Sequence, residues 1–346
     1  MDPVLLLTMG DPAGIGPETT VKALAHPETH RGCTPVVVGD RKPLEEVLGF
    51  THSGLKLRIV ASPQQAKGEA GIIELFDIRA LEGKAYEPGH LSADCGEAAF
   101  RYVTKAIELS LQGMAAGVVT APINKEALHL AGHRYSGHTE IFADYTHTRD
   151  YAMLLMSGKL RVIHVTTHVS MREACDLIKT PRVYRTICLA REALEMLGIP
   201  HGRIGVAGLN AHASENGLFG HEEEEAILPA IEQARAEGMN VDGPVPPDTV
   251  FVKAVGGMYD IVVAMYHDQG HIPLKLYGFR MDLATGLFTS MSGINTTIGL
   301  PIIRTSVDHG TAFDRAGKNT ANEMSMVEAV TTAVRMIPYY EAKRHG

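Results

Sequence analysis

Short runs of apolar residues recur along the chain and predict buried strands. The clearest run covers residues 261–266 and is continuously apolar, as expected for a central parallel strand that is covered on both faces. Residues 92–111 instead show helical spacing of their apolar positions. The pattern therefore predicts an α/β fold with a buried parallel sheet. Other predicted strands are Val4–Thr8, Val36–Gly39, Gly117–Thr120 and the runs that begin at Leu160 and Ile204.

Three of these strands are followed by a histidine. His168, His212 and His267 come after the runs that begin at Leu160, Ile204 and residue 261, respectively. Parallel strands end at the same edge of a sheet, where open α/β folds bind their ligands, so these imidazoles are expected to converge. Three imidazoles with an open fourth position are typical of a catalytic metal site. A lone histidine would more often be a hydrogen-bonded loop residue.

Other ionisable side chains lie near predicted strand ends. Lys125 and Asp268 are candidate catalytic groups, although a solvated surface position is the alternative for a single lysine. Lys275 adds a positive charge beyond Asp268. Asp248 is a candidate to support the metal site by a hydrogen bond to one of its ligands.

Two features predict an anionic ligand. His138 and Thr139 precede a predicted helix, where backbone N–H groups favour anions, although a plain helix cap explains the motif equally well. Arg304 interrupts an apolar strand. A buried arginine needs an anionic partner, which indicates a phosphate or carboxylate.

Several stretches carry weaker signals. The glycine-rich turn at residues 10–16 lacks the Gly-x-Gly-x-x-Gly spacing, so it is not a Rossmann fingerprint, but its Asp11 is a candidate to reach the site. Residues 50–90 stay unassigned. The remaining expectations are a stiff connector at 242–249, an irregular segment at 277–293 and a solvated helix start at the acidic run 222–225.

Composition limits the partners of the chain. Its 346 residues are enough for two lobes, and a net charge of −8 argues against nonspecific nucleic-acid binding. Four widely spaced cysteines are typical of reduced thiols, and no signal-peptide layout or bilayer-length apolar stretch is present. We therefore expect a cytoplasmic enzyme with a small-molecule substrate and no nucleic-acid or membrane partner.

Five longer motifs can be compared with known families. They are Thr8-Met-Gly-Asp-Pro-Ala-Gly-Ile-Gly-Pro-Glu18, Gly137-His-Thr-Glu140, Asn210-Ala-His212, Tyr266-His-Asp-Gln-Gly270 and Arg304-Thr-Ser-Val-Asp-His-Gly-Thr-Ala312. Over nearly the whole chain they resemble the 4-hydroxythreonine-4-phosphate dehydrogenase family. The loop 309–317 also resembles the adenine-binding loop of isocitrate and isopropylmalate dehydrogenases, which implies NAD binding without a Rossmann fingerprint.

The resemblance implies a two-lobed α/β/α subunit, like that of isocitrate and isopropylmalate dehydrogenases, in a homodimer. The first lobe would comprise residues 1–125 and 295–346, with the NAD loop, and the second residues 126–294. One divalent metal ion (Zn, Mg, Mn or Co) would be bound by His168, His212 and His267, drawn from both subunits. The implied substrate-binding residues are His138, Thr139, Lys275, Asn295 and Arg304, and the implied cofactor-binding residues are His309, Gly310, Thr311, Ala312 and Asp314.

The implied reaction is oxidation of a 3-hydroxyl group by NAD, followed by loss of carbon dioxide from a 4-phosphorylated four-carbon acid. The metal ion would stabilise negative charge, and Lys125 or Asp268 would take the hydroxyl proton. The segment between Lys275 and Asn295 is longer than in the vitamin B6 pathway enzymes by about ten residues, and loops tolerate such insertions. This resembles D-threonate or D-erythronate 4-phosphate dehydrogenases, which form dihydroxyacetone phosphate, and we expect the longer segment to set substrate choice.

Three alternatives stay open. The first is 4-phosphohydroxy-L-threonine as substrate, in pyridoxal phosphate biosynthesis. The others belong to different classes: a metal-dependent hydrolase that uses the same three histidines, and a noncatalytic anion-binding protein. Formation of NADH would separate the dehydrogenases from these two classes.

Overall fold

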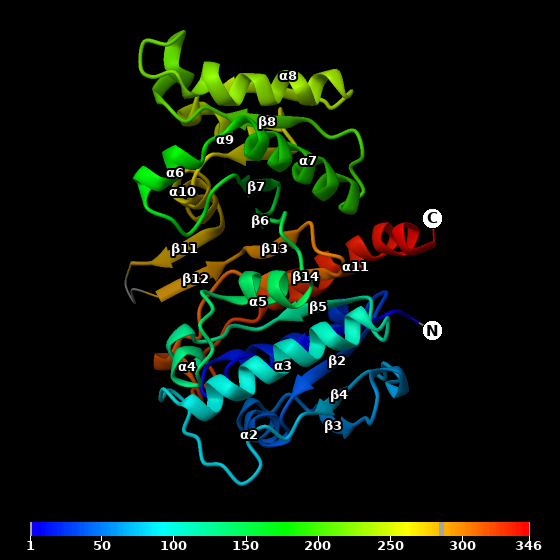
Figure 1. Ribbon diagram of the computed structural model, residues 1–346. Helices are drawn as coiled ribbons and strands as arrows, with labels where there is room; N and C mark the ends of the chain where they lie inside the picture. Colours follow the sequence, from blue (N-terminus) through cyan, green and yellow to red (C-terminus); the bar gives the residue numbers. More distant parts are fainter. Residues whose placement is uncertain (1, 284–286, 346) are drawn as a thin grey trace. The chain divides into compact units, whose positions relative to one another are not determined.

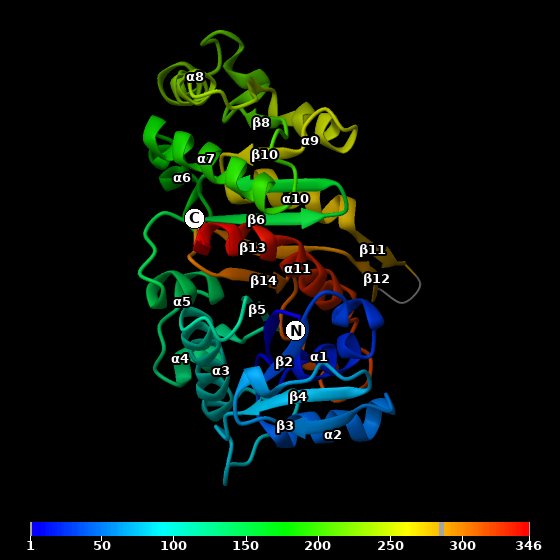
Figure 2. The same cartoon turned by 90° about the vertical axis from the view of Figure 1, so that its right-hand side faces the viewer.

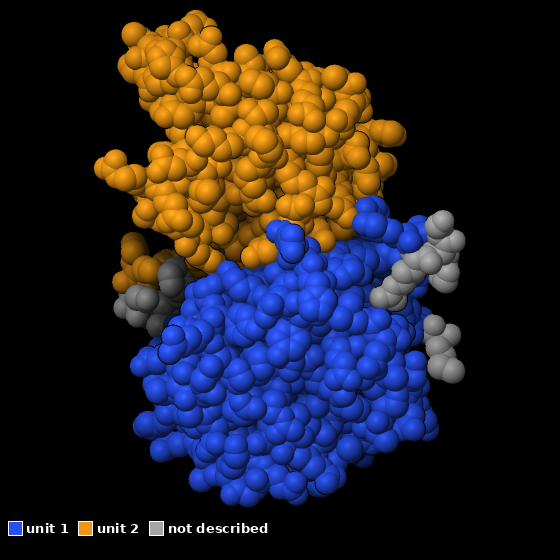
Figure 3. All heavy atoms as spheres, in the orientation of Figure 1, with its two compact units in different colours: residues 1–149, 300–346 blue, residues 150–299 orange. Residues whose placement is uncertain are grey.

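A computed structural model of the chain describes residues 2–283 and 287–345. The chain forms two compact units (Figure 3): unit 1 comprises Met1–Arg149 and Leu300–Gly346, and unit 2 comprises Asp150–Gly299. Both units combine helices with a sheet, which confirms the α/β class. His138 and Thr139, which were expected in the second lobe, belong to unit 1.

Unit 1 is built on a parallel sheet with the strand order β3, β4, β2, β1, β5, β14 (Figure 1). The central strand β1 is fully buried at Leu5, Leu6 and Leu7, as its apolar run predicts. The strands are β1 Val4–Thr8, β2 Thr34–Gly39, β3 Lys56–Ile59, β4 Ile72–Asp77, β5 Gly117–Thr120 and β14 Ile303–Val307.

The helices of unit 1 cover this sheet (Figures 1 and 2). Helix α3 packs on β1, β2 and β5, and α11 packs on β5 and β14. The α-helices are α1 Gly16–Leu24, α2 Arg41–Thr51, α3 Ala93–Leu111, α4 Lys125–Leu130, α5 His138–Tyr145 and α11 Met324–His345, with short 3₁₀ turns η1 Pro27–His30, η2 Pro63–Gln65 and η5 Phe313–Arg315.

Unit 2 has a mixed sheet with the order β13, β6, β7, β10, β8, β9. Strands β7, β10, β8 and β9 are parallel, whereas β6 runs antiparallel to β7 and to β13. The strands are β6 Ala152–Ser157, β7 Leu160–His164, β8 Ile204–Ala207, β9 Val241–Val245, β10 Ile261–Ala264 and β13 Ile294–Ile298. The helical segments are α6 Met171–Leu177, α7 Thr180–Met196, η3 Ala211–Glu215, η4 Glu223–Ile227, α8 Leu228–Ala236, α9 Pro247–Val255 and α10 His267–Gly278.

Two of the weaker expectations are wrong, and a third holds except at one residue. The expected connector 242–249 forms most of β9 and the start of α9, because Val241 and Val245 are buried and anchor a short strand around Pro244. The expected irregular segment 277–293 contains an antiparallel hairpin of β11 Phe279–Asp282 and β12 Leu287–Met291; its residues 284–286 lie outside the described part of the chain. The acidic run 222–225 begins a helical segment in which Glu224 and Glu225 are exposed, as expected, but Glu223 is buried within the π-helical turn.

The unassigned region 50–90 contains two strands that the sequence analysis missed: the edge strand β3, which has no buried residue, and β4, in which Ile73 and Leu75 are buried. Within residues 2–283 and 287–345, no helix has the length and apolar character required to cross a membrane.

Candidate active site

The carboxyl ends of β7, β10 and β8 carry the three predicted metal-ligand histidines. These strands are adjacent and parallel, so they end at one edge of the unit 2 sheet, as the sequence argument requires. The rings of His168 and His267 lie 5.8 Å apart between centroids. The structure therefore brings these two imidazoles together within one chain.

His212 does not join that pair. It lies in the exposed turn after β8, with its ring 6.1 Å from that of Phe219. In the described part of the chain, no set of three His, Cys, Asp or Glu side chains is arranged to hold a metal ion. Within one chain, the imidazoles of His168 and His267 therefore form a pair, and the imidazole of His212 lies apart from them.

The turn that carries His212 has a left-handed backbone. Residues 212–216 all have positive φ angles, between 46° and 69°, and none of them is glycine. This conformation costs roughly 1–2 kcal/mol per residue, so it persists only where surrounding contacts hold it. Such strain is typical of functional sites.

His267 is held from two sides. Its Nδ1 lies 2.7 Å from Oδ1 of Asp268. A carboxylate accepts, so this contact favours the tautomer of a neutral imidazole with the proton on Nδ1 and the lone pair on Nε2. The His271 ring stacks on the His267 ring at 3.6 Å, and His271 Nδ1 donates to the His267 carbonyl oxygen at 2.9 Å. The geometry favours Asp268 as the residue that orients His267, a role different from the predicted catalytic base.

A buried layer lies beneath this histidine pair. His164 stands 4.8 Å from His271, and burial lowers the pKa of His164 to about 3 and that of His271 to about 4. A Cβ on Gly270 would lie only 2.3 Å from Nε2 of His164, so this helix position has room only for glycine. Gln269 accepts from the Met265 N–H at 2.6 Å and donates to the Gly208 carbonyl at 2.8 Å, which ties the ends of β10 and β8 together.

The two other predicted substrate residues of unit 2 lie on different elements. Lys275 is exposed in the last turn of α10, with Nζ 5.6 Å from the centre of the Phe279 ring. Asn295 is half-buried in β13, where it pairs with Leu155 of β6. The predicted metal-supporting residue Asp248 is exposed in the first turn of α9.

In unit 1, Arg304 is buried within β14, as predicted, and is only 2% exposed. Its Nη2 donates to Oγ1 of Thr120 at 3.1 Å, and its guanidinium lies 5.7 Å from the centre of the Phe142 ring. Burial lowers the pKa of Arg304 to about 9, although the nearby Glu140 carboxylate opposes this shift. The side chain therefore remains cationic at neutral pH, in a protected position.

His138 is the first residue of α5, where the sequence placed it beside a helix amino terminus. Burial, together with the Arg304 charge, lowers the pKa of His138 well below its ordinary value, so the ring is neutral. Its Nε2 is buried and has no hydrogen-bond partner among the described residues. Thr139 follows in the first turn of the helix and is half-buried.

Lys125 is exposed at the start of α4, after the Asn124 cap. Its Cε lies 3.9 Å from the position that a Cβ on Gly137 would occupy. The predicted catalytic lysine is thus close to the segment that leads into His138.

The predicted cofactor loop lies after β14 and is held by the glycine-rich turn. The Ile15 N–H donates to the Thr311 carbonyl at 2.9 Å, and a Cβ on Gly14 would lie 2.9 Å from that of Thr311. This close approach explains why residue 14 is a glycine. Nε2 of His309 is buried, and residues 2–283 and 287–345 offer it no hydrogen-bond partner. Gly310, Ala312 and Asp314 complete the predicted set, and a Cβ on Gly310 would meet open space.

Asp11 belongs to the same turn and is fully buried. Its Oδ1 accepts from the Ala13 N–H at 2.9 Å, whereas Oδ2 has no hydrogen-bond partner in the part of the chain that the structure describes. Burial raises the pKa of Asp11 to about 6, although the hydrogen bond from Ala13 opposes this. The sequence pointed to this residue without indicating that it would be buried.

The sequence reasoning missed the residues that hold the candidate ligands. His164 packs beside His271, Gln269 ties the ends of β10 and β8 together, and Glu223 supports the His212 turn. Gln269 lies in the Tyr266–Gly270 motif, so its position was a usable signal. Nothing in the acidic run distinguishes Glu223 from its neighbours.

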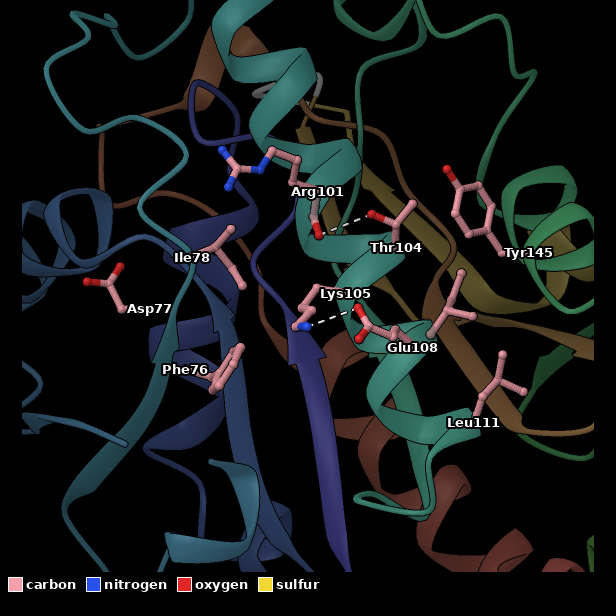
Figure 4. A pocket seen from close by; sticks show the side chains of 10 residues that line it. Phe76, Asp77, Ile78, Arg101, Thr104, Lys105, Glu108, Leu111 and Tyr145 are labelled. Carbon is pink, nitrogen blue, oxygen red and sulfur yellow. Dashed lines mark hydrogen bonds and ion pairs between the residues drawn. The ribbon is translucent and has the colours of Figure 1, made fainter. Parts of the chain in front are cut away.

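A separate hollow on unit 1 lies between β4 and α3 (Figure 4). Arg101, Lys105 and Glu108 are among its lining residues, and none of the predicted site residues described above is. Nζ of Lys105 donates to Oε2 of Glu108 at 2.9 Å, so this cation is neutralised within its own helix. The hollow therefore gives no independent support for an anion site.

Comparison with known proteins identifies the family. The family described as "Pyridoxal phosphate biosynthetic protein PdxA" matches residues 31–333. The chain is 49% identical over 330 residues to D-threonate 4-phosphate dehydrogenase of Cupriavidus necator, covering 95% of both proteins. It is also 49% identical over 332 residues to the Salmonella typhimurium enzyme of that name, covering 95% of this chain and 98% of the relative.

A solved structure agrees with this assignment. The 4-hydroxythreonine-4-phosphate dehydrogenase from Klebsiella pneumoniae is 46% identical, with a TM-score of 0.85, and the match covers 97% of this chain and 98% of that one. Both kinds of relative are dehydrogenases, which excludes the hydrolase and the noncatalytic alternatives. The resemblance drawn from the motifs is confirmed, and this chain belongs to the PdxA family of dehydrogenases.

Proposed function

We propose that this protein oxidises D-threonate 4-phosphate with NAD and releases dihydroxyacetone phosphate and carbon dioxide. The observation that carries the proposal is full-length similarity to D-threonate 4-phosphate dehydrogenases, at 49% identity. D-Erythronate 4-phosphate belongs to the same substrate class and differs only in the configuration at one carbon.

Arg304 and His138 would bind an anionic end of this substrate. Arg304 keeps its charge in a buried position, where an ionic hydrogen bond is weakly screened by water. The unpartnered Nε2 of His138 can hydrogen bond to an oxygen of the ligand, and the backbone N–H groups in the first turn of α5 would favour an anion. Thr139 would add its hydroxyl. The family resemblance also assigns Lys275 and Asn295, which belong to unit 2, to substrate binding.

The three histidines have the donor chemistry of a divalent metal site. His168 and His267 would bind the ion from one chain, and His212 would supply a third imidazole. When bound, the ion would stabilise negative charge on the substrate. Asp268 prepares His267 for this role because it fixes the Nδ1–H tautomer.

The loop 309–317 would hold NAD, which accepts the hydride. His309 offers a buried, unpartnered Nε2, and the open space at Gly310 allows a ligand to approach the backbone. Thr311 and Gly14 keep the loop against the rest of unit 1. Lys125, beside the segment that leads to His138, would take the proton of the substrate hydroxyl from a neutral-amine form, which then becomes the ammonium.

We further propose a homodimer in which each active site uses both subunits. His168 and His267 come together in one chain, whereas His212 is exposed on a different turn, and a second chain would complete the set. Helix α10, strand β11 and the residue after it expose apolar side chains that a partner would cover: Ile272, Leu276, Met281 and Leu283 are more than half exposed, at 64%, 77%, 52% and 93%.

The test is a comparison of substrates with the purified enzyme, NAD and a divalent metal salt. NADH formation would be followed by absorbance for D-threonate 4-phosphate, D-erythronate 4-phosphate and 4-phosphohydroxy-L-threonine. We expect kcat/KM to be highest for D-threonate 4-phosphate and at least about tenfold above the amino compound, since an unmatched buried polar group is costly. Preference for the amino compound would overturn the proposal.

The amino compound is the second candidate because the Klebsiella pneumoniae structure carries the name 4-hydroxythreonine-4-phosphate dehydrogenase. The phosphate and the reacting hydroxyl are common to both candidates. The residues described for unit 1 would therefore serve either substrate, and discrimination must come from groups that face the 2-substituent.

A further inference from the structure

The turn that carries His212 needs support from outside itself. Its run of positive φ angles, from His212 to Asn216, contains no glycine. Ser214 fixes the far end, because its Oγ donates to the Gly220 carbonyl at 2.6 Å and accepts from the Gly217 N–H at 2.8 Å. The near end, where the chain leaves β8, is held by a different side chain.

Glu223 holds the near end. Its Oε1 accepts from the backbone N–H groups of Leu209 and Asn210, both at 2.7 Å, and its Oε2 accepts from Asn210 Nδ2 at 2.8 Å. The side chain is buried, and a Cβ on Gly208 would come within 3.0 Å of Oε1 and 2.9 Å of the Ala213 Cβ. The buried carboxylate therefore fixes the residues that lead directly into the turn.

We propose that Glu223 is a positioning residue that holds His212 in its ligand conformation. The inference rests on the proposed function, in which His212 binds the metal ion. A carboxylate suits the place because all three of its partners are donors and an ionised carboxylate only accepts. Glutamine would turn an NH₂ group toward Asn210 Nδ2 and lose one of these bonds.

The central measurement is the affinity for Zn²⁺, determined by competition with a chromophoric chelator, with kcat and KM measured alongside. We expect Glu223→Gln to weaken Zn²⁺ binding and lower kcat by about 10- to 100-fold, as loss of groups that orient ligands commonly does. The KM for substrate should change less than about twofold. Glu224→Gln is the matched control, because Glu224 is exposed on the same turn.

A rescue separates positioning from general stability. Glu215 is exposed and has a φ of 46°, so Glu215→Gly favours the left-handed turn without removing a packed side chain. Added to Glu223→Gln, it should recover at least about threefold of the lost Zn²⁺ affinity. A lower melting temperature with unchanged Zn²⁺ affinity would show that Glu223 is only structural and would overturn the proposal.

The variant His212→Ala distinguishes the two levels of inference. If it leaves Zn²⁺ affinity unchanged, the metal site itself is wrong. If it weakens binding while Glu223→Gln does not, the site stands and the positioning role fails. Should Glu223→Gln not fold, Asn210→Ala removes the Oε2 contact of Glu223 together with a bond to Glu222, and Glu222→Gln is its control. A severalfold weaker Zn²⁺ affinity is then expected for Asn210→Ala alone, and no change would overturn the role of Glu223.

Discussion

The candidate site residues of unit 1 and unit 2 differ in their burial. In unit 1, Arg304 and His138 are buried, and their own chain sets their charge states. In unit 2, His168 and His212 are exposed, and the buried residues lie behind the imidazoles that would bind metal. One chain can thus preform the proposed anion site, whereas the proposed metal site would need a metal ion and a second chain.

The largest expected effect tests the unit 2 side of this comparison. His267→Ala removes a proposed metal ligand, and kcat/KM should fall about 10²- to 10³-fold because stabilisation of developing charge is lost. Stripping the wild-type enzyme with a chelator should give a similar loss, restored by added metal. His201→Ala is the control, since His201 is an exposed histidine of the same unit. Retention of more than about a tenth of the activity would contradict the assignment.

The next largest effect is on the free energy of unfolding, and it tests the burial of an ionisable residue in unit 1. Burial raises the pKa of Asp11 from 3.8 to about 6, so the folded state favours the neutral carboxyl group. The contribution of Asp11 to the free energy of unfolding is fully present below pH 3.8 and is lost as the pH rises through about 6. A side-chain amide stays neutral at every pH, so Asp11→Asn should raise the free energy of unfolding at pH 7 by ~3 kcal/mol.

Urea denaturation of both proteins at pH 7 and at pH 4 measures this difference. The gain should nearly vanish at pH 4, where the wild-type carboxyl is mostly protonated in the folded state. An equal difference at both pH values would mean that ionisation of Asp11 is not its cause. The amide retains an acceptor for the Ala13 N–H, so no hydrogen bond is lost.

A smaller effect is expected from Arg304→Lys, which keeps the charge but not the planar fork of donors. We expect kcat/KM for the phosphorylated substrate to fall about 10- to 100-fold, the range of one or two charge-assisted hydrogen bonds. Thr120→Val is the control, because it removes only the hydroxyl that Arg304 contacts. If both variants lose the same activity, local packing and not ligand binding explains the loss.

The sequence predicted the strands and strand ends better than their surroundings. Apolar runs located β1, β5, β7, β8 and β10, and histidines after three of them indicated one sheet edge. The region 50–90 failed because edge strands such as β3 bury few side chains and so leave no pattern. Tertiary contacts decide the rest.

Glu223 and Asp11 illustrate that limit. In the sequence, Glu223 is one of four consecutive acidic residues. Its role follows from the fold, in which two backbone N–H groups donate to its buried carboxylate. Asp11 was noticed for its place after a strand, but its raised pKa follows from burial among segments that are distant in the sequence. Side-chain spacing carries no information about either environment.

The smallest expected effect is a factor of two, and it tests which histidines a subunit contributes. Because His168 and His267 lie together in one chain, they should serve the same site, and His212 should serve the site of the partner. A heterodimer of one His212→Ala subunit and one His267→Ala subunit then retains one intact site. Its activity should reach about half that of the wild-type dimer, since one of its two sites is intact.

The internal control is the heterodimer of His168→Ala with His267→Ala, in which each site lacks one ligand and no activity should return. Differently tagged subunits, purified through both tags, would give each heterodimer free of the parent homodimers. Activity in both heterodimers would mean that His168 and His267 serve different sites despite their proximity. Inactivity of both would place all three ligands in one subunit's site, which would require the His212 turn to move toward the pair.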